Sequence, residues 1–400
     1  MDCKKIASYF AEWEALCERD NGRLWGVNLR TPFVIINPET REAVANEPDS
    51  GGEPVSRFPS NLVISASVTE FGGKRWAMAP SILMEHIQPK NGLRIMVHEA
   101  FHCTQPDLFG ECDTDPDNSH MDEADSRIGF FLEANALIKS LKTRGTERIS
   151  AIQTALSVRD NRRLTYNKAN DENLAELMEG TAVYTEIKIN HEDDAISEAV
   201  TYADNAKNFA SLAHYFGYVT GMLYCLVLDS TGTDWKKDLK FGADLGGMLM
   251  EAMDIKEFPA FDKIDRQELD GYGYSEIVET ERIRAEIHEA MLKEIRDAFT
   301  EQPVLQVHED GEKSIMGEII NLTDLGTVLK GQIEFIGDFG RMFMQGGLFL
   351  MHNDGCSMVS ADGLKVEGRY VTSTYWEMEL NEGFDVHAQK NGNGFLLVRG

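Results

Sequence analysis

The sequence contains no long apolar run. A helix that crosses a bilayer needs about 20 consecutive, mostly apolar residues, and no such stretch occurs among the 400 residues. We therefore expect no membrane span. The first residues, Met1 to Ile6, lead into a charged amphipathic segment instead of the apolar core of a signal peptide. This pattern favours a cytoplasmic protein, although an exported form that has lost its signal would look the same.

Cysteine and positive charge are also scarce. Six cysteines occur without a C-x-x-C pair, so we expect reduced thiols and no disulfide framework. Lys and Arg number 39 against 67 Asp and Glu, which gives a net charge of −28. So acidic a chain argues against nucleic acid and anionic membranes as partners. The overall composition, with 42% hydrophobic and 26% charged residues, is typical of a globular protein.

The most informative stretch reads H-E-A-F-H, from His98 to His102. Two histidines four residues apart lie on one face of a helix, where their ring nitrogens can bind a single zinc ion. Glu99 then faces the open side of the metal, where it can take a proton from the zinc-bound water and pass it to a leaving amine. The neighbouring residues are apolar, and a charged group among them is costly unless a metal or hydrogen bonds satisfy it. The alternative is a surface turn with two ordinary hydrogen-bonded histidines.

A second motif, E-G-T-A-V-Y, runs from Glu179 to Tyr184. Together the two motifs resemble the gluzincin clan of zinc metallopeptidases, and in particular a group of poorly characterised bacterial gluzincin-like peptidases. The resemblance covers residues 75–230 and implies that Glu179 is the third zinc ligand. Met178 stands where the aminopeptidase-N-like branch of the clan has Asn.

The third ligand has a competing assignment. Glu179 follows His102 by 77 residues (179 − 102), whereas many gluzincins place this Glu about twenty residues after the second histidine. At that shorter spacing the chain offers Asp122, Glu123 and Asp125. These three also suit the start of a helix, where acidic side chains interact favourably with the helix dipole. We favour Glu179, because the small residues that follow it would let its helix approach the histidine helix closely.

Tyr218 is the candidate donor to the oxyanion that develops during peptide hydrolysis. It lies in an apolar segment before a Thr-Gly pair, and the bacterial proteins that the chain resembles also have a Tyr there. The alternative is a core tyrosine whose hydroxyl binds backbone. His214 and Tyr215 are weaker candidates for the same role.

Other residues are expected to support the site. Carboxylates should orient the histidines from behind, and the candidates are Glu176, Glu186 and the acids at 122–125. Residues 75–79 form an expected strand just before the histidine helix. The resemblance implies that this sheet edge binds the substrate backbone as an added strand.

The sequence pattern divides the chain into three parts. Residues 1–90 combine an amphipathic helix with short strand candidates, among them 24–29 and 62–65. Residues 91–300 are mainly helical, and 303–400 alternate between apolar and polar residues with frequent turns. We therefore predict an α+β protein. It would have a small N-terminal sheet, a helical core and a β-rich C-terminal subdomain. The resemblance implies that the sheet is part of the catalytic unit and that the helical part is a metallopeptidase core of thermolysin-like type.

These features predict a zinc-dependent metallopeptidase that acts on a peptide or protein substrate. Zinc would be bound by His98, His102 and Glu179, while Glu99 activates the water and Tyr218 assists. The alternative is a non-catalytic, metal-stabilised binding or scaffold protein that uses its C-terminal β subdomain. A zinc site closed by a fourth protein ligand would favour that alternative.

Overall fold

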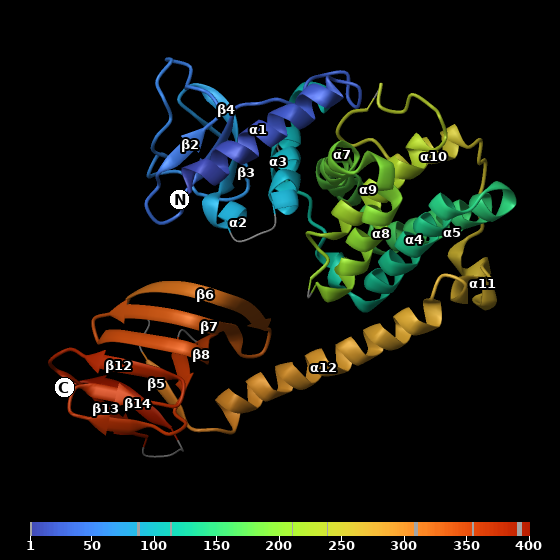
Figure 1. Cartoon of the computed structure of the whole chain (residues 1–400). Helices are drawn as coiled ribbons and strands as arrows, with labels where there is room; N and C mark the ends of the chain where they lie inside the picture. Colours follow the sequence, from blue (N-terminus) through green and yellow to red (C-terminus); the bar gives the residue numbers. More distant parts are fainter. Residues whose placement is uncertain are drawn as a thin grey trace. The chain divides into compact units, whose positions relative to one another are not determined.

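The structure is a computed structural model that describes residues 2–85, 89–112, 114–209, 211–237, 239–307, 311–353, 356–389 and 394–400. Contacts divide the chain into two units, Met1–Glu281 and Arg282–Gly400. The predicted α+β class is confirmed, since the first unit has a small sheet and a mostly helical core and the second is rich in strands (Figure 1). Within the described ranges, no helix has the length and apolar character needed to cross a membrane.

The helices and strands of the first unit are α1 (Cys3–Asp20), β1 (Phe33–Ile36), β2 (Ala43–Ala45), β3 (Ser67–Phe71), β4 (Lys74–Pro80), α2 (Ser81–Glu85), α3 (Pro89–Phe109), α4 (Ala124–Lys142), α5 (Gly145–Tyr166), α6 (Ala169–Ala175), a π-helical turn (Glu176–Gly180), α7 (Thr181–Asn190), α8 (Ala195–Asn205), α9 (Phe216–Asp229), α10 (Leu245–Ala252), α11 (Arg266–Asp270) and α12 (Tyr274–Thr300), which continues into the second unit. The strands of the second unit are β5 (Val304–Val307), β6 (Gly311–Leu322), β7 (Gly326–Gly337), β8 (Gly340–His352), β9 (Ser357–Ser360), β10 (Lys365–Glu367), β11 (Tyr370–Thr372), β12 (Trp376–Leu380), β13 (Phe384–Ala388) and β14 (Phe395–Arg399).

The four strands of the first unit form one sheet in the order β2-β1-β4-β3. β4 lies inside, parallel to β1 and antiparallel to β3, so β3 stands at the end of the sheet. Two predicted strands do not form. Residues 24–29 are turns and coil, because Gly22 and Gly26 take positive φ angles of 78° and 76°, although Trp25 is buried as its apolar character suggested. Residues 62–65, predicted as a strand, do not form one, and the next strand, β3, begins at Ser67.

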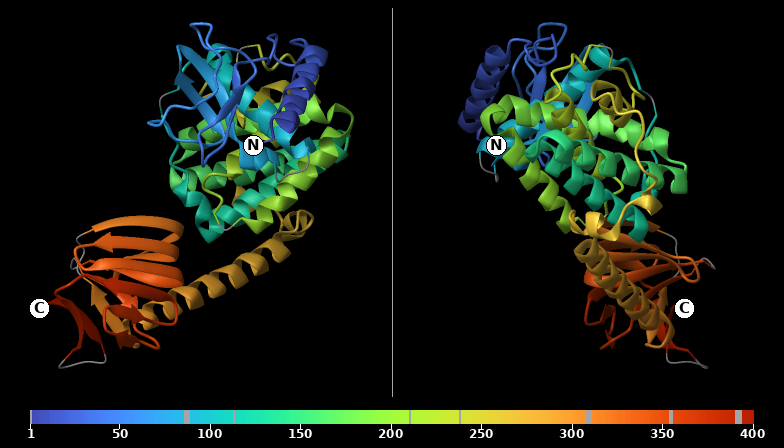
Figure 2. Two further views of the ribbon diagram at one scale, coloured as in Figure 1. Left: turned by 60° about the vertical axis from the view of Figure 1, so that its left-hand side comes forward. Right: turned by 90° about the vertical axis from the view of Figure 1, so that its right-hand side faces the viewer.

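Both faces of this sheet are covered. Alternate residues of a strand point to opposite faces, so Phe33 and Ile35 pack with the helices while Val34 and Ile36 pack with Phe58 on the other side. β4 leads through α2 into α3, which runs beside the sheet in both views of the first unit (Figure 2). Ala77 and Ala79 of β4 belong to the same buried core as Met96 and Val97 of α3, so the sheet packs against the histidine helix.

α9 lies in the middle of the helical core. Nearly all of its side chains are buried, and a helix that is apolar on every side needs neighbours all round. A Cβ on Gly180 of the π-helical turn would lie 2.4 Å from the Cα of Gly221, and one on Gly221 would lie 2.4 Å from the carbonyl oxygen of Glu176. The two backbones are thus in direct contact. The small residue after Glu179 therefore serves packing against α9, rather than the approach to the histidine helix that the sequence suggested.

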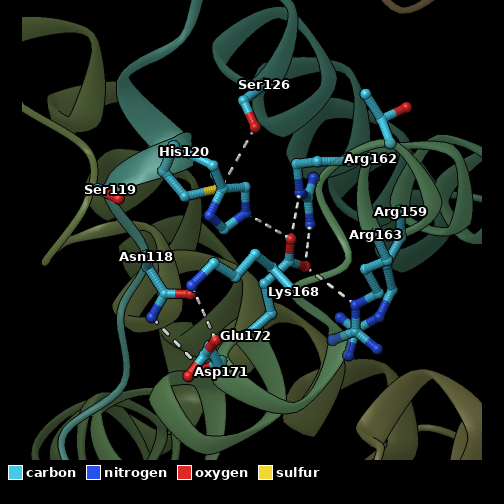
Figure 3. Close-up of polar contacts among 12 residues, drawn as sticks. Asn118, Ser119, His120, Ser126, Arg159, Arg162, Arg163, Lys168, Asp171 and Glu172 are labelled. Atoms are coloured by element: carbon cyan, nitrogen blue, oxygen red, sulfur yellow. Dashed lines mark hydrogen bonds and ion pairs between the residues drawn. The ribbon is translucent and has the colours of Figure 1, made fainter.

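A buried ion network holds the segment that leads to the π-helical turn. Figure 3 shows Glu172 of α6 in contact with His120, Arg162 and Arg163, at distances of 2.9, 2.8 and 3.0 Å. Burial by itself would raise the pKa of Glu172, but Arg162 and His120 hold it far below its usual range. The carboxylate is therefore ionised, and it anchors α6 to α5 and to the segment before α4.

Arg159 holds the π-helical turn itself. Its guanidinium binds both carboxylate oxygens of Glu176, at 2.6 and 2.5 Å, and also reaches Asp244 at 3.0 Å. The exposed fraction of Arg159 is 3%, and Glu176 is fully buried. Glu176, a sequence candidate for orienting the histidines, therefore belongs to this network instead.

Arg159→Met should lower the free energy of unfolding by about 3–5 kcal/mol, because it removes the cation that binds both oxygens of the buried Glu176 carboxylate and leaves only Arg163, at 3.5 Å. Urea unfolding of the zinc-supplemented protein measures this loss. Arg144→Met is the matched control, since Arg144 is exposed at the start of the same helix, and its effect should stay within about 0.5 kcal/mol. Equal stability of the two variants would show that the network does not stabilise the core.

The second unit has a ten-stranded sheet among its described residues, with the central path β10-β11-β12-β8-β9-β5-β14-β13 and the long pair β6-β7 joined to β8. One core cluster includes Phe335 and Phe349. Ile295 and Phe299, from the last turns of α12, pack on this sheet in a second cluster. The sequence pattern predicted that the C-terminal subdomain begins at residues 300–303, where the strands begin. The contacts divide the chain earlier, between Glu281 and Arg282 within α12.

Candidate metal centre

α3 carries both histidines of the H-E-A-F-H stretch. His98 and His102 lie one turn apart, with ring centroids 4.6 Å apart and an interplanar angle of 78°. Their Nε2 atoms are 2.9 Å apart. Because both nitrogen atoms point to one place, a single ion can contact the two rings.

Glu179 reaches the same place from the π-helical turn. Its Oε2 atom lies 3.3 Å from His98 Nε2 and 3.2 Å from His102 Nε2. Among the described residues, His98, His102 and Glu179 form the group of three His, Cys, Asp or Glu residues that could bind one metal ion. Their donor atoms all lie within 4.8 Å of one another. Ligands at about 2.0–2.1 Å from a tetrahedral zinc ion are about 3.3 Å apart. The triangle of donor atoms, with sides of 2.9, 3.3 and 3.2 Å, therefore fits zinc.

Neighbouring carboxylates make this point favourable for positive charge. Burial by itself would lower the pKa of His98, but hydrogen bonds with Glu179 and Glu186 raise it to about 10. Burial would raise the pKa of Glu179, whereas His102 and His98 hold it well below its usual range. Glu179 is thus ionised, as a metal ligand must be, and a metal ion that binds the imidazoles takes the place of a proton there.

Each histidine is also held from behind through Nδ1. His98 Nδ1 lies 3.4 Å from Glu186 Oε2, and Arg94 Nε donates to the other oxygen of Glu186 at 2.8 Å. His102 Nδ1 lies 2.8 Å from Gln105 Oε1. Glu186 was among the residues predicted for this role, whereas Gln105 was not. The sequence did contain a signal for Gln105. A residue three positions after His102 lies one turn further along the same helix face and can contact its ring.

The competing acidic residues make other contacts. Asp122 accepts hydrogen bonds from the backbone N–H of Leu212 and the hydroxyl of Ser211, both at 2.6 Å. It therefore fixes the segment before α9. Glu123 precedes α4 and Asp125 lies in its first turn, and both side chains are exposed. The structure thus brings Glu179, and none of these three, into the group with the histidines.

The donor triangle lines a cavity of about 470 Å³. Glu99 lines it too and is only 6% exposed, and within the described residues its Oε2 atom has no hydrogen-bond partner. Burial raises the pKa of Glu99, so its carboxylate takes up a proton more readily than an exposed carboxylate does. A buried, proton-accepting oxygen at this point is suited to general base catalysis.

Tyr218 enters the cavity from α9. Its ring lies parallel to the ring of His98, with an interplanar angle of 6° and a centroid distance of 5.7 Å. Burial and the negative charge of Glu179 raise the pKa of Tyr218 far above its usual value. The hydroxyl therefore stays protonated and can donate a hydrogen bond inside the cavity.

The edge strand at this cavity is β3, not β4. Residues 75–79 were the predicted substrate-binding edge, but β4, which contains them, is paired on both sides. β3 stands at the end of the sheet, and its residues Ser67, Val68 and Glu70 line the cavity. Arg75 of β4 also lines the cavity, and its guanidinium donates to Glu111 at 3.2 Å.

Comparisons of the chain with protein-family models, with curated proteins and with solved structures found no match. The cavity combines a triangle of possible metal-binding donor atoms, a buried carboxylate beside it, a protonated tyrosine and an edge strand.

Proposed function

We propose that the chain is a zinc-dependent metallopeptidase of gluzincin type. The observation that carries the proposal is the triangle of donor atoms from His98, His102 and Glu179, with sides close to those of a tetrahedral zinc site. Its substrate would be a peptide or protein, and a cytoplasmic location belongs to the same proposal. Glu99 in the same cavity supports catalysis over a purely structural metal site.

A bound zinc ion would polarise the scissile carbonyl and make water a better nucleophile. Glu99 accepts a proton from that water on its unpartnered Oε2 atom. Once the amide nitrogen begins to leave, Glu99 returns the proton to it, so one carboxylate acts first as base and then as acid. The pKa of Glu99, raised by burial, favours the first of these two proton transfers.

The free edge of β3 suits an extended peptide. Backbone groups of an edge strand can pair with an added strand, which places the peptide along the cavity with its side chains alternating. A peptide paired in this way would present a peptide bond beside the donor triangle without a requirement for one particular side chain. The three-donor group also favours the peptidase over the scaffold alternative, because structural zinc sites are closed by four protein ligands.

Metal analysis combined with a peptide-library cleavage assay tests the proposal. The purified chain should hold about one zinc ion. It should cleave peptides, lose this activity with a chelator and regain it when zinc is added. A chain that holds zinc tightly and cleaves nothing in the library would support the non-catalytic scaffold instead.

Tyr218→Phe should lower kcat by about 10²-fold with a smaller change in KM, because removal of one oxyanion donor acts mainly on the transition state. Steady-state kinetics on a cleaved library peptide measures both constants. Tyr215→Phe removes the neighbouring hydroxyl and should leave kcat unchanged. A loss confined to Tyr215→Phe would transfer the donor role to Tyr215.

A further inference from the structure

Gln105 lies between the two parts of the metal centre. It is 3% exposed and follows His102 by one turn on α3. Its Oε1 atom is 2.8 Å from His102 Nδ1. Its Nε2 atom donates to the carbonyl oxygen of Met178 at 2.7 Å and to the hydroxyl of Thr181 at 3.0 Å. One side chain therefore contacts both the histidine helix and the turn that carries Glu179.

The orientation of this amide follows from its partners. The carbonyl oxygen of Met178 can only accept a hydrogen bond, so the amide nitrogen of Gln105 must face it and the amide oxygen must face His102. That oxygen accepts only, so Nδ1 of His102 carries a hydrogen. A neutral imidazole protonated on Nδ1 has its lone pair on Nε2, which is the atom in the donor triangle.

The same amide fixes the π-helical turn. Hydrogen bonds in such a turn run from residue i to residue i+5, so its carbonyl groups are displaced from the regular α-helical pattern. Gln105 supplies a donor to the peptide group that links Met178 to Glu179. The position of this peptide determines where the side chain of Glu179 begins, and hence whether its carboxylate reaches the histidines.

We propose that Gln105 is a positioning residue that sets the geometry of two of the three metal-binding side chains at once. It holds the ring of His102 in the tautomer that binds a metal, and it holds the backbone that presents Glu179. The inference rests on the proposed metal centre, though not on peptide hydrolysis. It also accounts for a buried amide that contacts two segments more than 70 residues apart in the chain.

Gln105→Met tests this role, because it keeps a side chain of similar length and removes both contacts. Zinc affinity, measured by competition with a chromophoric chelator, should fall about 10- to 100-fold. The visible absorption of the Co²⁺-loaded chain should change as well, since those bands depend on the geometry of the ligands. Asn135→Leu is the matched control: it removes an amide hydrogen bond to the carbonyl of Tyr272 in the same unit and should leave affinity and spectrum unchanged.

Gln105→Asn is the second variant, and it keeps an amide that is one methylene too short to span both partners. It should shift affinity and spectrum in the same direction as Gln105→Met, with less risk to folding. Wild-type affinity together with a wild-type Co²⁺ spectrum in either folded variant would overturn the positioning role. A wild-type chain that binds neither Zn²⁺ nor Co²⁺ would overturn the metal centre itself, and this inference with it, so the two failures are distinguishable.

Discussion

Glu99→Gln should leave zinc bound and lower kcat by up to about 10⁴-fold. The substitution preserves shape and volume in the cavity but replaces a proton-accepting oxygen with an amide. Because Glu99 lies outside the donor triangle, metal content should stay at the wild-type level. Because Glu99 would serve both as base and as acid, its loss should affect both proton transfers. The decrease in kcat should therefore lie near the upper end of the range of about 10²–10⁴-fold for general acid–base groups.

Steady-state kinetics on a cleaved peptide, with zinc content measured on the same samples, checks this result. Glu123→Gln is the matched control, since it neutralises an exposed carboxylate at the start of α4 and should leave kcat unchanged. If Glu99→Gln turns over peptide as fast as the wild type, Glu99 is not the base. If it loses zinc together with activity, the assay has measured metal binding instead of proton transfer.

Glu179→Ala, His98→Ala and His102→Ala should each abolish tight zinc binding, because each removes one of three protein ligands. The histidine variants should be the more severe, since each also removes one of the two imidazoles that contact the carboxylate of Glu179, and His98→Ala removes a partner of Glu186 as well. Zinc analysis after dialysis against a weak chelator measures the retained metal.

Zinc should also stabilise the folded wild type. An ion present at about 100 times its Kd adds about 2.7 kcal/mol to the free energy of unfolding, and the three ligand variants should lose most of this gain. Glu123→Ala is the control and should keep both the metal and the gain. Full zinc retention by Glu179→Ala, with loss in an Asp122 or Asp125 variant, would move the third ligand to the acidic residues. Full retention by both histidine variants would remove the metal centre.

Several features could be predicted because they depend on neighbours in the sequence. A spacing of four residues fixes His98 and His102 on one helix face, and Glu99, the residue after the first histidine, lines the same cavity. Alternation and turns also identified the strand-rich second unit, which the structure confirms. By contrast, an apolar run was not enough to make residues 24–29 a strand, since Trp25 is buried by tertiary packing while its backbone turns.

The sequence by itself determined the acidic character of the chain, its α+β class and the helix that carries His98, Glu99 and His102. It did not decide whether the third metal ligand is Glu179 or one of the acidic residues at 122–125. Only the tertiary structure decided which of them lies beside the histidines, because that position depends on contacts between distant segments: glycine packing against α9, the Arg159 network and the amide of Gln105. The free edge at β3 was likewise decided by strand order, which no local pattern specifies.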